Sequence, residues 1–228
     1  MEIKMSAEGG SASGGETNTN IPPMSKKDYY LSFLAGLFIG LLFLPVLSAA
    51  KPDLYGKINL FIIPFFFLAV PFGLVIAHMI SRKIAVIWQL GKFGVTGVLN
   101  VLVDLGFLSL ITFAFRTYLN IDSKTIIFSF LTYYSLYKSL SFIIANINSY
   151  FWNKYWTFNQ QGGKSTEFIQ FFVVSVVGFL VNVIVASLVF RAISGFSADQ
   201  AGLIGASAGS VAGLAWNFIG YKFIVFKK

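Results

Sequence analysis

Two ionisable side chains of opposite charge stand inside long apolar stretches of the sequence. Asp104 lies midway along one stretch, and Lys138 lies near the middle of the next. A carboxylate buried in hydrocarbon costs about 2.5–3.5 kcal/mol on insertion scales, so an acid at this depth needs a partner. Antiparallel neighbouring helices would bring Asp104 and Lys138 to a similar depth and allow an ion pair. The alternative, which the sequence leaves equally open, is that Lys138 extends to the outer interface and Asp104 is hydrogen-bonded to Asn, Ser or Tyr.

Six asparagines occur in or beside the same apolar stretches. A carboxamide both donates and accepts hydrogen bonds, which suits sugar hydroxyls or a phosphate, but it serves equally well as a polar contact between helices. Contact between helices is the better default for any one of them. Asn100 and Asn182 are the exceptions, because Asn100 shares a helix face with Asp104 and Asn182 occupies the equivalent acidic position in a second copy of the pattern. The set comprises Asn100, Asn146, Asn148, Asn153, Asn182 and Asn217.

Two lysines lie among aromatic residues at the ends of apolar stretches, at matching positions of an internal repeat. Aromatic residues and lysines at helix ends usually anchor a protein at the membrane interface, and most such residues here fit that role. Lys154 and Lys222 would also be brought to equivalent places about a pseudo-twofold axis, where they could hold an anionic group such as a phosphate. We therefore add both to the candidate site.

Few other residues are suited to catalysis. Cysteine is absent and His78 is the single histidine, so thiolate chemistry and a histidine-based metal centre are not expected. Of the acids only Asp104 is placed in the membrane, whereas lipid-facing hydrolases and glycosyltransferases need clustered carboxylates or a nucleophile with a base. We expect a protein that is not an enzyme, with no catalytic residues, metal or cofactor.

The elements that carry these residues are membrane helices. The 228 residues are 56% hydrophobic and 11% charged, with a mean hydropathy of +0.75, whereas soluble domains are about 25% charged. The apolar runs approach or exceed the ~20 residues that cross ~30 Å of hydrocarbon, and they do not alternate as barrel strands do. The sequence predicts an all-α polytopic bundle of six transmembrane helices, after a disordered tail over residues 1–28. The expected spans are 31–49, 59–80, 93–115, 126–152, 168–190 and 201–221.

The distribution of cationic residues predicts the orientation. Of the 17 lysines and arginines, eleven lie on the side of the N-terminus, five lie on the opposite side, and Lys138 falls inside a span. Both termini are therefore expected in the cytoplasm, and the net charge of +8 is largely an orientation signal rather than evidence for nucleic acid. The eleven are Lys4, Lys26, Lys27, Arg82, Lys83, Lys92, Lys154, Lys164, Lys222, Lys227 and Lys228.

An internal repeat relates the last four spans. Residues 92–104 align with 170–182, and residues 149–158 align with 217–226. Chance similarity in low-diversity apolar sequence is the alternative, but agreement at both ends of both units favours a duplication. Each unit contains two spans, so the copies are parallel and related by an axis along the membrane normal. The matched pairs include Phe93 with Phe171, Asp104 with Asn182, Lys154 with Lys222, and Phe158 with Phe226.

These residues resemble the GtrA-like membrane proteins. The family opens with "FxxxGxxNxxxD", here Phe93, Gly97, Asn100 and Asp104, and closes with "NxxWTF", here residues 153–158, before a second and weaker copy. The resemblance covers about residues 89–228, as repeats 89–158 and 167–228. The sequence departs from the four-span family pattern by two additional spans within residues 29–88 and by Ile-Val-Phe where the first copy has Trp-Thr-Phe.

The resemblance implies a multi-pass protein of the cytoplasmic (inner) membrane that translocates an undecaprenyl-phosphate-linked sugar for cell-surface polysaccharide synthesis. Its expected partners are the polyprenyl-phosphate sugar lipid, membrane lipids, a second copy of the chain and a glycosyltransferase, with no nucleic acid. Two alternatives are a small proton-coupled exporter, which needs Asp104 free of Lys138, and a subunit that scaffolds a glycosyltransferase. The expected substrate-binding residues are Asn100, Asp104, Lys138, Asn148, Asn153, Lys154, Asn182, Asn217 and Lys222.

Overall fold

The fold is all-α, with two long helical hairpins arranged around a central helix. The computed structural model describes residues 23–129, 131–163, 166–196 and 198–227. In these residues the chain forms six α-helices. A short π-helix follows α4 and another follows α6, and a small antiparallel hairpin joins α3 to α4. The α-helices are α1 (Lys26–Ala50), α2 (Pro52–Ser81), α3 (Val86–Tyr118), α4 (Tyr133–Trp152), α5 (Glu167–Ala192) and α6 (Ala198–Gly220). The remaining elements are β1 (Ile126–Phe128), β2 (Leu131–Thr132), η1 (Asn153–Thr157) and η2 (Tyr221–Val225).

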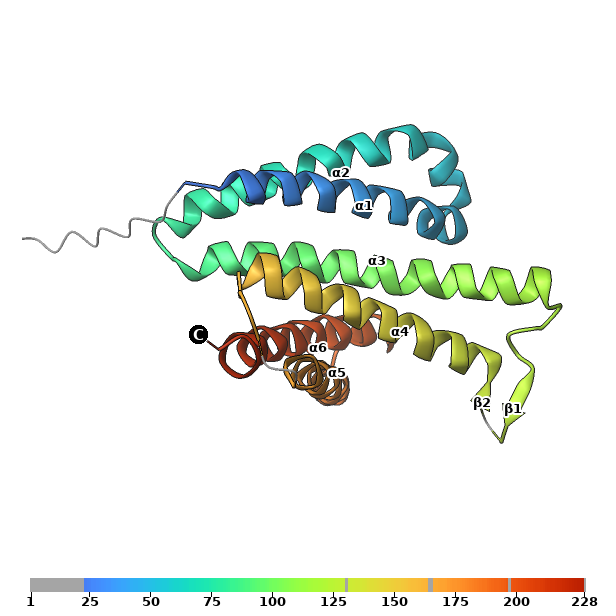
Figure 1. The fold of residues 1–228 in the computed structure, drawn as a ribbon. Coiled ribbons are helices and arrows are strands. Elements are labelled where there is room, and N and C mark those ends of the chain that lie inside the picture. Colours follow the sequence, from blue (N-terminus) through green and yellow to red (C-terminus); the bar gives the residue numbers. More distant parts are fainter. Residues whose placement is uncertain (1–22, 130, 164–165, 197, 228) are drawn as a thin grey trace, which may run out of the picture.

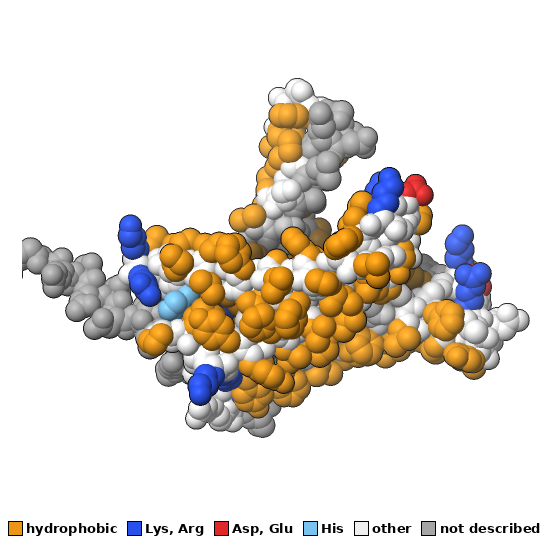
Figure 2. All heavy atoms as spheres, turned by 90° about the horizontal axis from the view of Figure 1, so that it is seen from above, with side chains coloured by type: hydrophobic (Ala, Val, Ile, Leu, Met, Phe, Trp, Pro, Cys, Tyr) orange, Lys and Arg blue, Asp and Glu red, His pale blue; other side chains and the backbone are white. Residues whose placement is uncertain are grey.

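Four helices, α1, α2, α3 and α5, are long and apolar enough to cross a bilayer. Their outward faces carry large apolar side chains, and the side chains of Leu60, Phe61 and Phe72 on α2 are 83%, 70% and 67% exposed. Figure 2 shows such side chains over most of the visible face, with Lys and Arg side chains gathered toward its ends. Exposed apolar surface of this extent is stable only against lipid, so the protein is a multi-pass membrane protein.

The central helix α3 separates the two hairpins. In Figure 1, α1 and α2 lie on one side of α3, α4 runs along it, and α5 with α6 lies on the other side. The α5–α6 hairpin crosses the rest at a steep angle, so that α5 is seen nearly end-on. The beginning of α1 and the C-terminal end lie at one end of α3, and the β1–β2 hairpin lies at the other.

The predicted fourth span, 126–152, begins too early. The helix starts at Tyr133, and residues 126–128 and 131–132 form the paired strands β1 and β2 instead. β-branched and aromatic residues favour strands, Ser129 takes a left-handed backbone conformation (φ 52°), and Thr132 caps α4 in a capping box with Ser135. Lys138 consequently lies in the second turn of α4 rather than near the middle of a span.

The predicted tail, 1–28, lies mostly outside the described residues. Within them, α1 begins at Lys26, and Ser25 caps it with Asp28 in a reciprocal capping box. Residues 26–28 are therefore helical. Asp28 therefore belongs to the folded part of the chain, and its carboxylate contacts Lys92 near the beginning of α3.

Closely packed glycines hold both helical hairpins together. A Cβ atom on Gly36 would lie 2.4 Å from the carbonyl oxygen of Phe66, and one on Gly209 would lie 2.4 Å from that of Asn182. Side chains at these positions would force the backbones apart, so small residues are required. The glycine ridges of α1 and α6 are thus buried inside one chain, against α2 and α5.

The two units end in the same unusual way. η1 and η2 occupy matching positions of the repeat, and each closes with an i to i−5 hydrogen bond from the following residue. The Phe158 N–H donates to the Asn153 carbonyl at 2.9 Å, and the Phe226 N–H donates to the Tyr221 carbonyl at 2.7 Å. π-Helical turns are rare, so their recurrence at matching positions agrees with the repeat predicted from the sequence.

Aromatic contacts follow the same pseudo-symmetry. Phe93 packs edge-on against Phe218, with ring centroids 5.4 Å apart, and the equivalent pair, Phe171 with Tyr150, is 5.5 Å apart. The beginning of each unit therefore packs against the end of the other. This exchange brings residues of the two units together at the end of the bundle that carries both π-helices.

Candidate substrate groove and its flanking ion pairs

A cavity of about 570 Å³ lies between α3, α4, α5 and α6. Its walls combine apolar side chains and glycines with amides and hydroxyls, and among the residues that line it there is no Lys, Arg, Asp or Glu. We call this cavity the groove. Its polar lining residues are Asn100, Asn146, Ser149, Asn153, Ser175, Asn182, Ser210, Asn217 and Tyr221.

Three asparagines of the groove have free hydrogen-bonding capacity. The carboxamide oxygens of Asn100, Asn153 and Asn217 are buried and have no hydrogen-bond partner in the described part of the chain. The Asn153 amide is held in place, because its nitrogen donates to the Ser149 carbonyl at 2.9 Å. Each unpaired buried acceptor costs roughly 1–3 kcal/mol, which a ligand with hydroxyl donors would offset.

Gly178 makes room for one of these asparagines. A Cβ atom at Gly178 would lie 2.0 Å from the side-chain oxygen of Asn217. In the repeat alignment Gly178 takes the position of Asn100, and the Asn217 side chain occupies the space that a side chain at Gly178 would need. The sequence contained this signal, since a glycine stands where the first copy has an asparagine.

Asp104 and Lys138 form the ion pair that the sequence left open. The Lys138 ammonium contacts Asp104 Oδ2, and the Ser141 hydroxyl donates to Asp104 Oδ1 at 2.7 Å. The Lys138 side chain is 41% exposed and that of Asp104 is 19% exposed. Neither residue lines the groove. The pair joins α3 to α4 beside the groove, so Asp104 does not lie among the residues that a groove ligand would touch.

The six predicted asparagines divide into two groups. Five of them line the groove, and Asn148 does not. Asn148 is half-buried on α4, and its amide nitrogen has no partner among the residues that the structure describes. The structure therefore brings together Asn100, Asn153, Asn182 and Asn217 of the predicted site, and it also adds Asn146.

Lys154 is buried in an ion pair. Its ammonium lies 2.8 Å from Glu167 Oε1 and donates to the Tyr150 hydroxyl at 3.0 Å, and that hydroxyl donates to Glu167 at 2.7 Å. Lys154 and Glu167 are only 8% and 3% exposed. Burial alone would lower the pKa of Lys154, but the bonds to Glu167 and Tyr150 outweigh it and raise the pKa to about 12. Its charge is thus already compensated within the protein.

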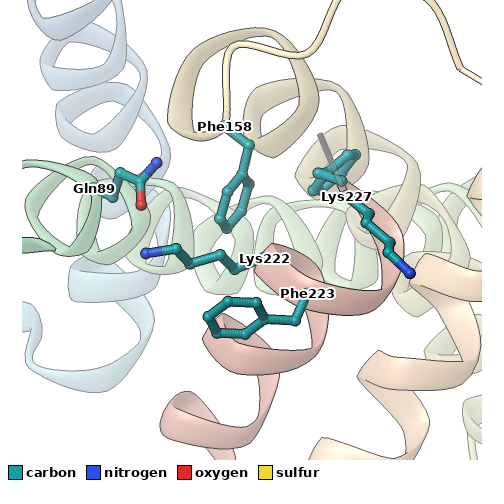
Figure 3. Close-up of a pocket in the computed structure, with 6 residues that line it drawn as sticks. Gln89, Phe158, Lys222, Phe223 and Lys227 are labelled. Carbon is teal, nitrogen blue, oxygen red and sulfur yellow. The ribbon is translucent and has the colours of Figure 1, made fainter.

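Lys222, at the matching position, has a different environment. It is half-buried, and its ammonium lies 5.6 Å from the ring centroids of both Phe218 and Phe223. It lines a cavity of about 340 Å³ that opens at the end of the bundle where the chain ends, together with Gln89. Figure 3 shows Lys222 extending toward Gln89. Within the described residues Lys222 has no ion pair and no hydrogen bond from its side chain.

A second polar cluster, which sequence reasoning missed, attaches α1 to the repeats. Asp28 Oδ1 accepts from Lys92 at 3.3 Å and from the Trp156 indole N–H at 3.1 Å. Lys27 donates to the Tyr155 carbonyl at 2.6 Å and to the Asn159 side chain at 3.2 Å. The two additional helices are therefore fastened by charge and hydrogen bonds at the end where η1 lies.

Comparison with known proteins identifies the family. The domain described as GtrA/DPMS, transmembrane domain, matches residues 92–226, which include every residue of the predicted site. Comparisons with curated proteins and with solved structures gave no match. The match indicates a membrane protein that handles polyprenyl-phosphate sugars. The chain belongs to the GtrA/DPMS transmembrane-domain family, with two further helices before the matched region.

Proposed function

We propose that the protein translocates a polyprenyl-phosphate-linked sugar, such as an undecaprenyl-phosphate sugar, across the cytoplasmic membrane. The observation that carries the proposal is the groove with its three unpaired carboxamide oxygens, on Asn100, Asn153 and Asn217. A sugar headgroup is rich in hydroxyl donors, and amide acceptors fixed on helices would receive them in place of water. Family membership supports the polyprenyl-phosphate class of lipid.

The groove has the composition that a translocation route needs. A cavity of about 570 Å³ accommodates a sugar but not a long prenyl chain, which would stay in the surrounding lipid. Neutral amides bind hydroxyl groups with moderate strength, whereas a fixed charge in this cavity would hold or repel a charged headgroup. The groove therefore lowers the barrier for the polar headgroup without trapping it, and the protein acts on its substrate as a transporter rather than as an enzyme.

The orientation follows from the charges at the two ends of the bundle. Lys26, Lys27, Lys83, Lys154 and Lys222 belong to the end at which α1 begins and the chain ends. We place this end in the cytoplasm, because lysines and arginines concentrate on the cytoplasmic side of membrane proteins. Lys4, Lys164 and Lys228 belong to the same predicted set but lie outside the described residues.

The exporter alternative is less well supported. A proton-coupled exporter of cations needs a carboxylate that binds proton and substrate in turn, and Asp104 was the candidate for it. Its two oxygens contact Lys138 and Ser141, and it does not line the groove. The scaffold alternative differs from translocation in activity alone, so it is tested directly with the purified protein.

The test is reconstitution of the purified full chain into liposomes with a polyprenyl-phosphate sugar in the inner leaflet. Wild-type protein is expected to expose the sugar to an impermeant enzyme or oxidant outside, whereas Asn100→Leu is expected to reduce the rate at least tenfold. Asn59→Leu, the same change on α2 away from the groove, is the matched control. No exposure of the sugar by the wild-type protein would favour the scaffold, and equal rates for wild type and Asn100→Leu would refute the role of the groove.

A further inference from the structure

The two lysines of the π-helices provide an internal comparison. Lys154 is the second residue of η1 and Lys222 is the second residue of η2. Their aromatic neighbours also correspond. Lys154 lies 5.3 Å and 5.8 Å from the ring centroids of Tyr150 and Tyr155, and Lys222 lies 5.6 Å from those of Phe218 and Phe223. The two ammonium groups therefore stand in equivalent aromatic settings.

Among the described residues, in contrast, an anionic partner is present in only one of the two settings. Lys154 is neutralised by Glu167, which lies three residues before Gln170, the first aligned residue of the second unit. The equivalent residue of the first unit, three before Lys92, is Gln89, and Gln89 does line the cavity of Lys222. The Tyr150 hydroxyl that bridges Lys154 and Glu167 is likewise missing from its counterpart, Phe218. Both groups that stabilise the first ammonium are thus absent at the second.

The cavity beside Lys222 has room for an external anion. Its volume is about 340 Å³, and Figure 3 shows Lys222 and Gln89 directed toward each other across it. Lys227 also lines the cavity, but in Figure 3 its side chain points the opposite way. A half-buried ammonium without a counter-charge gains more from an anion than a fully solvated one, because less water competes for it.

We infer that Lys222 and Gln89 bind the phosphate of a lipid headgroup, in the place that corresponds to the Glu167 carboxylate beside Lys154. The Lys222 ammonium contributes charge and the Gln89 amide contributes a neutral donor, so the phosphate is not repelled. This inference rests on the proposed function and narrows it, since it assigns the lipid phosphate to one of the two lysines and excludes the other.

The walls of the cavity favour a lipid over a free phosphate ion. Three of the six lining residues are phenylalanines, namely Phe158, Phe223 and Phe226. Phe223 is 62% exposed, and the next residue, Ile224, is 54% exposed, so apolar surface continues outward from the cavity. An inorganic phosphate gains nothing from this surface, whereas the first isoprene units of a prenyl chain would cover it.

The experiment measures binding of farnesyl monophosphate, a short polyprenyl phosphate without a sugar, to the purified full chain. Farnesol and inorganic phosphate are measured in parallel. Wild type is expected to prefer farnesyl monophosphate to both. Lys222→Gln and Gln89→Glu are each expected to weaken its binding about tenfold or more, the first by removing the charge and the second by supplying an internal carboxylate. Lys83→Gln, which removes an exposed lysine from the same end, is the matched control.

The outcomes separate this site from the groove. Unchanged affinity in Gln89→Glu or in a folded Lys222→Gln protein would overturn the inference, as would binding of inorganic phosphate equal to that of farnesyl monophosphate. Asn100→Leu is expected to bind farnesyl monophosphate normally although it fails to move the sugar lipid. If translocation is absent from the wild type but Lys222→Gln still weakens binding, the phosphate site stands and the proposed function falls.

Discussion

The two units of the domain keep the same helices and aromatic contacts but differ in their charges. The first unit has the Asp104–Lys138 pair between its helices, whereas the second has Asn182 where Asp104 would stand. Lys154 pairs with Glu167 across the units, whereas Lys222 has no ion pair among the described residues and shares its cavity with Gln89. The two units therefore have the same scaffold, but their equivalent lysines differ in whether an acid faces them.

We infer from this difference that paired charges stabilise the fold and that unpaired polar groups bind ligand. Where charges are paired, as at Lys154, the contact joins two elements and stabilises the fold. Where an amide stands at the equivalent position, as at Asn182 and Gln89, a polar surface stays available to a ligand. The predictions below test this comparison by removing a pair or by restoring one, in order of decreasing expected effect.

The largest effect is expected from Glu167→Gln. The change leaves the Lys154 ammonium buried without a counter-charge, which typically costs about 3–5 kcal/mol. The measurement is the free energy of unfolding in detergent or bicelles. Adding Lys154→Gln should restore much of the loss, because the buried charge is then removed as well. A loss below about 1 kcal/mol would show that the pair does not join the units.

The same ion pair predicts how stability depends on pH. The pKa of Lys154 is raised from 10.5 to about 12 in the folded protein, so the pair contributes fully below 10.5 and is lost as the pH rises through 12. The stability difference between wild type and the double variant Lys154→Gln/Glu167→Gln, in which neither group titrates, is therefore expected to be constant from about pH 6 to 9. Thermal unfolding over that range measures it, and a difference that fell within it would contradict the raised pKa.

An intermediate effect is expected from Asp28→Asn. Lys92 is 6% exposed and would lose its ion-pair partner, although an amide oxygen still accepts the Trp156 N–H. We expect a loss of about 1.5–3 kcal/mol and faster proteolysis near the beginning of α1. Lys26→Gln, at an exposed neighbouring lysine, is the control. Proteolysis at the wild-type rate would show that the additional helices are held by other contacts.

The smallest effect is expected from Asp104→Asn. Lys138 is partly solvated and does not need the carboxylate, so the loss should be about 1 kcal/mol or less. The substitution makes the first unit resemble the second at this position, where Asn182 stands. Because Asp104 does not line the groove, translocation is expected to persist in the liposome assay. Abolished translocation in a stable Asp104→Asn protein would place the acid in the transport step.

Much of this architecture is predictable from the sequence. Long apolar runs indicate the membrane spans, the lysine distribution indicates the orientation, and the duplicated motif indicates the repeat. The Asp104–Lys138 pair was among the alternatives for the same reason, because an acid in an apolar helix requires a partner. The β1–β2 hairpin was not predicted, because Ile126 to Phe128 are as apolar as a span and hydropathy does not distinguish the two.

The contacts between units were harder to predict. The sequence predicts Lys154 as an interfacial or ligand-binding cation, and its ion pair with Glu167 escapes prediction because Glu167 lies in the next helix, three residues before the aligned segment 170–182. The sequence predicts residues 1–28 as a tail, since a polar stretch before a span has no periodicity to mark it as folded. Both contacts join charged residues that are distant in sequence, so no local pattern reports them.

The most direct test of the central claim is photo-crosslinking with a polyprenyl-phosphate sugar that carries a photoreactive group on the sugar. The proposed function predicts labelling of peptides from α3, η1 and α6 that contain Asn100, Asn153 and Asn217, with competition by unlabelled sugar lipid. Labelling is expected to decrease in Asn217→Leu but not in Asn59→Leu. Labelling confined to α1 and α2, or labelling insensitive to the competitor, would contradict the claim that the sugar passes through the groove.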